Sequence, residues 1–282
     1  MGKDSSIEWT DHTFNPWTGC TKVSEGCTNC YAEGWAKRSG LVQWGPKGER
    51  RRTSAANWRQ PEKWDRLAAA DGRRAKVFCA SLADVFEDHP SIDPQWRADL
   101  WALIDATPHL DWLLLTKRPE NISRLWPFGF YDEFFSWPNV WIGTTVENQE
   151  QADARIPHLM AVPAAVRFLS CEPLLGPVDL ENVTHPSWLP PADDLHPEYW
   201  PVVAYDVLRG HIKGPDDIGQ PKVDWVIVGG ESGPKARDNG FVENARSLLI
   251  QCKASGVAFF GKQNVKKAPL PDDLIVREFP NV

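Results

Sequence analysis

The chain lacks any long apolar run. None of its hydrophobic stretches approaches the ~18 to 20 residues that a helix needs to cross a bilayer. Its first residues, MGKDSSIEWTD, lack the apolar stretch of a secretory signal. Internal repeats and low-complexity tracts are also missing. We therefore expect a cytoplasmic protein that makes no contact with a membrane.

Disulfide bonds are not expected either, although the chain has six cysteines. A chain of 282 residues can bury a full core, and without a secretory signal it does not need covalent cross-links. Cys79, in the apolar run KVFCAS, and Cys252, in a helical pattern, are predicted to be small core residues. Cys171 ends another apolar run, and its role is left open.

The other three cysteines lack a fourth partner nearby. Cys20, Cys27 and Cys30 form the pattern C-x6-C-x2-C, and thiolates at such short spacing favour zinc or an iron–sulfur cluster. A closed zinc site needs four ligands, which His12 would complete, but zinc ribbons usually carry two C-x2-C pairs and this chain has one. A 4Fe–4S cluster held by three cysteines leaves one iron open to a small molecule, and Tyr31 is placed to cover it.

Short, continuous apolar runs predict strands that are buried on both faces of a parallel sheet. They cover residues 76–81, 110–116, 139–145, 166–171, 223–230 and 257–261. Helical patterns lie between them at 93–107, 148–160 and 239–256, the last closed by Gly256 as a helix C-cap. Alternating strands and helices predict right-handed βαβ units and an α/β fold.

Each predicted strand ends on polar residues, at the end where parallel α/β proteins place their chemistry. The polar ends are Ser81 to Asp84; Thr116, Lys117 and Arg118; Thr144, Thr145 and Glu147; Ser170, Cys171 and Glu172; Gly229 to Ser232; and Lys262, Gln263 and Asn264. Six such ends favour a TIM-type (β/α) barrel, complete or incomplete, over a doubly wound open sheet. We expect residues 1–282 to form a single barrel domain, with 181–222 inserted across its mouth as a lid.

The segment 37–76 is strongly basic, although the chain as a whole has a net charge of −7. It holds twelve Lys or Arg and four acids, a local charge of +8 that leaves −15 for the remainder. Trp44, Trp58 and Trp64 lie among these charges. This pattern is typical either of a solvated helix and loop or of a surface for phosphates and stacked bases.

The cysteine stretch NPWTGCTKVSEGCTNCYAE resembles a phage-encoded protein family whose motif is similar to that of radical S-adenosylmethionine enzymes. Five further stretches look like that family's signatures: ASLADVFEDHP, LLLTKRPEN, VWIGTTVEN, FLSCEPLLGPV and VDWVIVGGESGPKAR. Within the wider superfamily, the succession of strand ends looks most like spore photoproduct lyase. The resemblance implies a 4Fe–4S cluster on Cys20, Cys27 and Cys30 that cleaves S-adenosylmethionine to a 5′-deoxyadenosyl radical.

The resemblance also implies roles for the polar strand ends. The superfamily usually has C-x3-C-x2-C, and a Gly-Gly-Glu after the second strand that holds the methionine amino group. Here the first gap is six residues and Gly229-Gly230-Glu231 falls on a later strand, so Ser81 or Asp84 is the better match for that role. Thr144 and Thr145 would hold the ribose hydroxyls. Independently of the resemblance, Lys117 ends the otherwise apolar run DWLLLT and is predicted to bind a carboxylate or phosphate.

The substrate of such an enzyme would be a nucleotide or nucleic acid bound through residues 37–76, with a reductant protein such as a flavodoxin or ferredoxin as electron donor. Two other classes stay open: a zinc-stapled protein that binds nucleic acid, and a barrel lyase or hydrolase that needs no metal. In the latter, Asp84, Glu147, Glu172 and Glu231 would be the acid/base groups. Glu147 and Glu172 are also typical of acids that stabilise a helix N-terminus.

Overall fold

The computed structural model describes residues 5, 7–127, 137–184, 204–212 and 221–281. The chain divides into two compact units. The first holds Met1–Gly143 and Pro163–Ala165; the second holds Thr144–Val162 and Val166–Val282. Among the described residues, no helix is long and apolar enough to cross a membrane.

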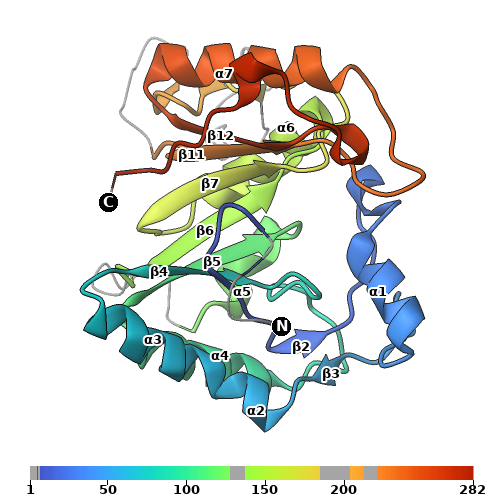
Figure 1. The fold of residues 1–282 in the computed structure, drawn as a ribbon, viewed down its shortest axis with the longest axis vertical. Helices are drawn as coiled ribbons and strands as arrows, with labels where there is room; N and C mark the ends of the chain where they lie inside the picture. The colour runs from blue at the N-terminus through green and yellow to red at the C-terminus, as the bar shows by residue number, and fades with distance from the viewer. Residues whose placement is uncertain (1–4, 6, 128–136, 185–203, 213–220, 282) are drawn as a thin grey trace, which may run out of the picture. The chain divides into compact units, whose positions relative to one another are not determined.

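In the first unit, helices alternate with strands, most of them short, and β5 is the longest of these strands. Its elements are β1 (His12–Thr13), β2 (Trp17–Thr18), η1 (Glu25–Cys27), α1 (Tyr31–Ser39), β3 (Arg51–Arg52), α2 (Ala55–Trp58), α3 (Gln60–Ala70), β4 (Ala75–Cys79), α4 (Pro94–Asp105), β5 (Leu110–Thr116), η2 (Pro119–Asn121) and α5 (Ile122–Leu125). Helix α3 packs on β4 and β5 and runs alongside β4 (Figure 1). Trp64 of α3 and Trp112 of β5 belong to this unit's core.

The second unit repeats the alternation around the strand β11. Strand β6 (Val140–Thr145) belongs to the first unit up to Gly143 and to the second from Thr144. The further elements of the second unit are α6 (Gln149–Met160), β7 (Val166–Cys171), β8 (Val183–Thr184), β9 (Ala204–Asp206), β10 (His211–Ile212), β11 (Trp225–Gly229), α7 (Phe241–Ser255), β12 (Ala258–Gln263), η5 (Val265–Lys267) and η6 (Asp272–Leu274). Helix α7 lies along β12 and β11 (Figure 1). It ends at Gly256, whose left-handed φ of 67° confirms the predicted C-cap.

The main sheet corrects the barrel prediction. In the described residues it has seven strands in the order β1-β4-β5-β6-β7-β11-β12, and the pairs β1–β4, β4–β5, β7–β11 and β11–β12 are parallel. A TIM barrel closes eight strands, each followed by a helix. The α/β class is therefore confirmed, whereas the TIM-type barrel is wrong.

The outer edge of β12 explains why this sheet does not close there. Gly261 N donates to Val276 O, and Glu278 N donates to Phe259 O, each at 3.0 Å. Phe260 and Arg277 form an antiparallel bridge between the same segments. The C-terminal segment thus uses the outer hydrogen-bonding groups of β12, which protects an edge that a barrel would have joined to another strand.

The predicted lid, 181–222, lies partly outside the described residues. Its described parts form a three-stranded antiparallel sheet in the order β10-β9-β8. Thr184 N donates to Asp153 Oδ1 of α6 at 2.9 Å, and β8 packs on that helix. The described part of this insertion is therefore fixed to α6. Residues 185–203 and 213–220 are the portions that fall outside the description.

Candidate metal centre

The three cysteines of the C-x6-C-x2-C pattern lie on one loop of the first unit. This cysteine loop, residues 19–31, leaves β2 and enters α1. Cys27 ends the short turn η1, and Cys30 occupies the position just before α1. All three are free thiols, and all three are partly exposed. The sequence therefore places three soft donors on one short, accessible segment.

The cysteine loop is tied at both ends to the segment that follows β4. At its start, Gly19 N donates to Leu82 O at 3.0 Å. At its end, the Tyr31 hydroxyl donates to Ser81 O at 2.8 Å. Tyr31 was expected to cover a cluster; it is 56% exposed and is anchored by its hydroxyl. Both ends of the loop are thus held at the carboxyl end of β4.

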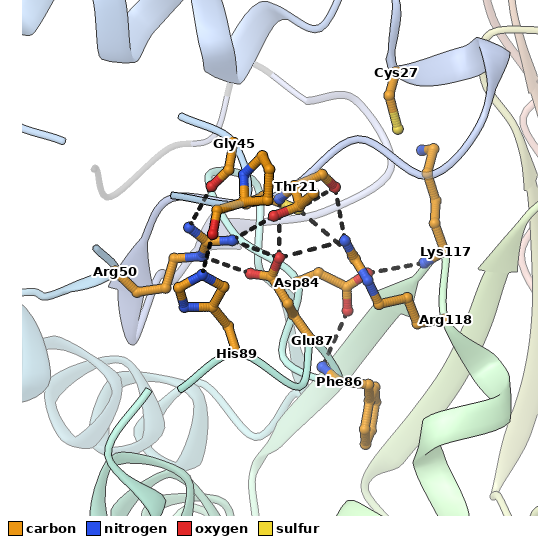
Figure 2. A network of polar contacts seen from close by, with 12 residues as sticks. Thr21, Cys27, Gly45, Arg50, Asp84, Phe86, Glu87, His89, Lys117 and Arg118 are labelled. Carbon is orange, nitrogen blue, oxygen red and sulfur yellow. Dashed lines mark hydrogen bonds and ion pairs between the residues drawn. The ribbon is translucent and has the colours of Figure 1, made fainter. Parts of the chain in front are cut away.

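Arg118, just after β5, joins the loop to the acids that follow β4 (Figure 2). One of its terminal nitrogens lies 3.6 Å from Cys20 Sγ and 3.0 Å from Asp84 Oδ2. Its other terminal nitrogen donates to Thr21 O at 2.7 Å. The side chain is buried. A planar guanidinium can make these contacts together because its donors form a fixed fork.

A second buried arginine, Arg50, completes the support beneath the loop. Its guanidinium forms two hydrogen bonds with the carboxylate of Glu87, at 2.7 and 2.6 Å, and donates to Thr21 Oγ1 at 2.6 Å. Glu87 also accepts from Thr21 N at 2.9 Å. Because Arg50 and Glu87 are both buried, this pair is a charged anchor in a low-dielectric setting.

Asp84, predicted to hold a ligand's amino group, is surrounded by donors from the chain. Its carboxylate accepts from Thr116 Oγ1 at 2.8 Å, Lys117 N at 3.1 Å and Phe86 N at 3.0 Å, besides the contact with Arg118. Asp84 therefore fixes the turn after β5. Ser81, the other residue predicted for that role, is partly exposed and lies 3.1 Å from Asn15 through its hydroxyl.

Lys117 is directed differently from its neighbour Arg118. Its backbone is fixed by Asp84, and Figure 2 shows its side chain extending from the end of β5 toward Cys27. The residue is partly exposed. A flexible ammonium in this position can bind a carboxylate or a phosphate as a point charge.

The thiol of Cys20 keeps its proton in the metal-free protein. Burial, together with the charges of Asp84 and Glu87, raises its pKa to about 12, although Arg118 acts in the opposite direction. For Arg118, burial alone would lower the pKa, but the charge of Asp84 raises it above its usual range. A metal that binds Cys20 must therefore displace a proton from sulfur.

The donor set fits an iron–sulfur cluster in its chemistry. Among the described residues, no three His, Cys, Asp or Glu side chains, the three cysteines included, are grouped so that they could hold a metal ion. His12, the fourth ligand of the zinc alternative, stacks on Trp64 with ring centroids 4.4 Å apart. By donor type alone, three thiols on one partly exposed loop match the ligands that an iron–sulfur cluster uses.

Three predicted site residues of the second unit are glutamates, and each forms an ion pair within that unit. Glu147 binds Arg155 at 2.7 Å, Glu172 binds Lys262 at 2.7 Å, and Glu231 binds Arg237 at 2.6 Å. Thr144 and Thr145, at the end of β6, are buried. The carboxyl ends of β7, β11 and β12 are thus occupied by paired charges, with Glu172 reaching Lys262 past Gly229.

Gly230 permits a close approach that any side chain would prevent. A Cβ here would lie 2.6 Å from the carbonyl carbon of Asn264 and would also meet the backbone of Val265. We expect Gly230→Ala to lower the free energy of unfolding by about 1–3 kcal/mol through overpacking. Gly34→Ala on α1 is the control, because its nearest atom is the flexible end of Arg38 at 3.4 Å. Urea denaturation of both variants measures this, and equal midpoints would contradict it.

Much of the basic charge in 37–76 is already paired within the first unit. Arg50 binds Glu87, Arg52 binds Asp99 at 2.6 Å, and Arg74 binds Asp111 at 2.7 Å. Trp64 is buried, and Trp58 packs edge-on against Phe14 and under Arg52. Two of the three tryptophans predicted for base stacking therefore support the fold.

Comparison with known proteins gives a family match, which covers most of the chain. A family model described as a protein of unknown function, DUF5131, matches residues 4–270. The chain belongs to the DUF5131 family. The match includes the cysteine loop and every polar strand end of this DUF5131 chain. No curated protein and no solved structure matches it.

Sequence reasoning missed the two arginines that organise the DUF5131 site. Arg50 was counted as part of a basic surface, and Arg118 was named only as a polar strand end. The local signal for Arg118 is the turn TKRPEN, in which Pro119 follows a strand that ends on polar residues. The partner of Arg50, Glu87, is 37 residues away, and nothing local identifies that pairing.

Proposed function

We propose that this DUF5131 protein is an iron–sulfur enzyme of the radical S-adenosylmethionine type. In this proposal Cys20, Cys27 and Cys30 hold a 4Fe–4S cluster. The observation that carries it is the anchoring of the cysteine loop: Gly19, Thr21 and Tyr31 are bonded to Leu82, Glu87 and Ser81, at the carboxyl end of β4. Such an edge is where parallel α/β proteins bind their ligands.

The number of cysteines favours an iron–sulfur site over the zinc alternative, because the fourth zinc ligand would be His12, which stacks on Trp64. Three thiolates leave one metal position without a protein ligand, which suits direct binding of a small molecule. The sequence resemblance implies that this molecule is S-adenosylmethionine. When reduced, such a cluster supplies the electron that cleaves S-adenosylmethionine to methionine and a 5′-deoxyadenosyl radical.

In this proposal, the chain's own residues bind and orient S-adenosylmethionine. Lys117 would bind the carboxylate of the methionine moiety, since its ammonium extends from β5 toward Cys27. Ser81, which is partly exposed at the end of β4, would accept from the amino group. Asp84 acts through the turn that it fixes, because its carboxylate is already engaged by Thr116, Lys117 and Phe86.

The finer parts of the proposal concern partners and location. A cytoplasmic protein would receive its electron from a flavodoxin- or ferredoxin-type donor. A nucleotide or nucleic acid substrate would meet the exposed basic residues of 37–76, such as Arg59, Lys63 and Arg66. The buried Arg50 takes no part in such a surface.

The experiment is cleavage of S-adenosylmethionine by the anaerobically reconstituted protein, with dithionite as the reductant. We expect slow formation of 5′-deoxyadenosine and methionine, measured by liquid chromatography and mass spectrometry, even without the substrate. Lys117→Met should keep the iron content and weaken S-adenosylmethionine binding about 10- to 100-fold, the usual worth of a charge-assisted hydrogen bond. A fully loaded, reduced cluster that neither binds nor cleaves S-adenosylmethionine would refute the radical mechanism.

A further inference from the structure

Arg118 contacts both a predicted metal ligand and the acids beneath it. Its guanidinium lies 3.6 Å from Cys20 Sγ, and the same group forms ion pairs with Asp84 at 3.0 Å and Glu87 at 3.4 Å. Arg118 donates toward a ligand sulfur, and the carboxylates of Asp84 and Glu87 oppose its charge. Glu87 is also paired with Arg50, at 2.7 and 2.6 Å. The sulfur of Cys20 therefore lies next to one cation whose position is fixed by two anions.

The reduction potential of an iron–sulfur cluster depends on hydrogen bonds to its sulfurs and on nearby charge. A donor or a positive charge stabilises the reduced cluster, which carries one more negative charge, and so raises the potential. A nearby carboxylate does the opposite. Because Arg118, Asp84 and Glu87 are all buried, their charges are screened less than exposed ones would be.

We propose that Arg118 sets the reduction potential of the cluster on Cys20, Cys27 and Cys30. Arg118 raises the potential, and the negative charge of Glu87 lowers it. This inference rests on the proposed iron–sulfur function. Arg118 acts through Cys20 and is a positioning residue, since no substrate or cofactor contact is assigned to it. Its other terminal nitrogen donates to Thr21 O at 2.7 Å, which holds the backbone next to Cys20 in place beside the guanidinium.

The experiment compares two variants whose effects should have opposite signs. Redox titration of the reconstituted protein, followed by electron paramagnetic resonance, gives the potential of each. Arg118→Gln removes the cation, and we expect the ratio of reduced to oxidised cluster at a fixed poise to fall about tenfold, a lowering of about 59 mV for a one-electron couple. Glu87→Gln keeps the shape of the side chain but removes an anion, and should raise the potential.

Arg124→Gln is the matched control. Arg124 lies on α5, close in sequence to Arg118, and its ion pair with Asp88 is exposed. Its loss should leave the potential unchanged, because solvent and salt screen an exposed charge. Arg118→Lys is a second test: it keeps the charge but not the fork, so the potential should fall less than in Arg118→Gln. Arg118→Lys also provides the test of Arg118 if Arg118→Gln does not fold.

Structural damage alone would move both variants in the same direction. Shifts of equal sign in Arg118→Gln and Glu87→Gln, or no shift in either, would therefore overturn the inference while leaving the iron–sulfur function intact. If the wild-type protein binds no cluster under the same conditions, the proposed function itself fails and this inference falls with it.

Discussion

Cys27→Ala should abolish both cluster binding and the cleavage of S-adenosylmethionine. With one of three thiolates removed, too few ligands remain to hold a 4Fe–4S cluster on this loop. We expect the broad absorption near ~400 nm of the reconstituted protein to disappear, iron to fall to background, and 5′-deoxyadenosine to be undetectable. The fold should persist, because Cys27 is partly exposed and the loop is anchored through Gly19, Thr21 and Tyr31.

The matched control is Cys252→Ala. Cys252 is buried in α7, and burial raises the pKa of its thiol to about 12, as expected of an inert core residue. Cys79 and Cys171 are buried as well, and burial likewise raises the pKa of both thiols. Removing the Cys252 sulfur should lower stability slightly and leave the iron content unchanged. Equal iron loss in both variants, or none in Cys27→Ala, would contradict the assignment of ligands.

Arg50→Met should destabilise the protein by about 3–5 kcal/mol, the usual cost of removing one partner from a buried ion pair. Glu87 would then lie in a buried site with Thr21 N and Arg118 as its remaining partners. The cysteine loop would lose the contact of Arg50 with Thr21 Oγ1 as well. Chemical denaturation followed by tryptophan fluorescence measures the loss, and cluster loading of the variant should fall with it.

Arg51→Met provides the comparison for this change. Arg51 is the next residue and shares the basic segment, but its side chain is exposed. We expect its replacement to change stability by less than about 0.5 kcal/mol, as is usual for surface positions. If both variants unfolded at the same denaturant concentration, Arg50 would belong to the basic surface predicted from the sequence and not to the buried support of the loop.

The strands could be predicted because their signal is local. Residues 110–116 and 166–171 are continuous apolar runs, and they form β5 and β7 with those bounds. Closure of the sheet could not be predicted, because polar strand ends mark one edge of a parallel sheet whether or not it closes. The outer edge of β12 is instead paired with 276–278, and that segment carries no apolar run. Strand β1, two residues long, gave no signal either.

The cysteine site could be predicted because its pattern is local. The arginines that hold the cysteine loop could not, because their contacts join residues far apart in the sequence. Three soft donors within eleven residues are a local pattern, whereas the contact of Arg118 with Cys20 spans 98 residues. Arginines on a surface and arginines in a buried network look alike in a sequence. Only the fold separates Arg50 from Arg51, because it brings Glu87 to one of them.

Iron and sulfide analysis of the anaerobically reconstituted protein tests the central claim most directly. The account predicts about four irons and four sulfides per chain, with no zinc, and their loss in each of Cys20→Ala, Cys27→Ala and Cys30→Ala. Stoichiometric zinc without iron in a normally folded protein would contradict it.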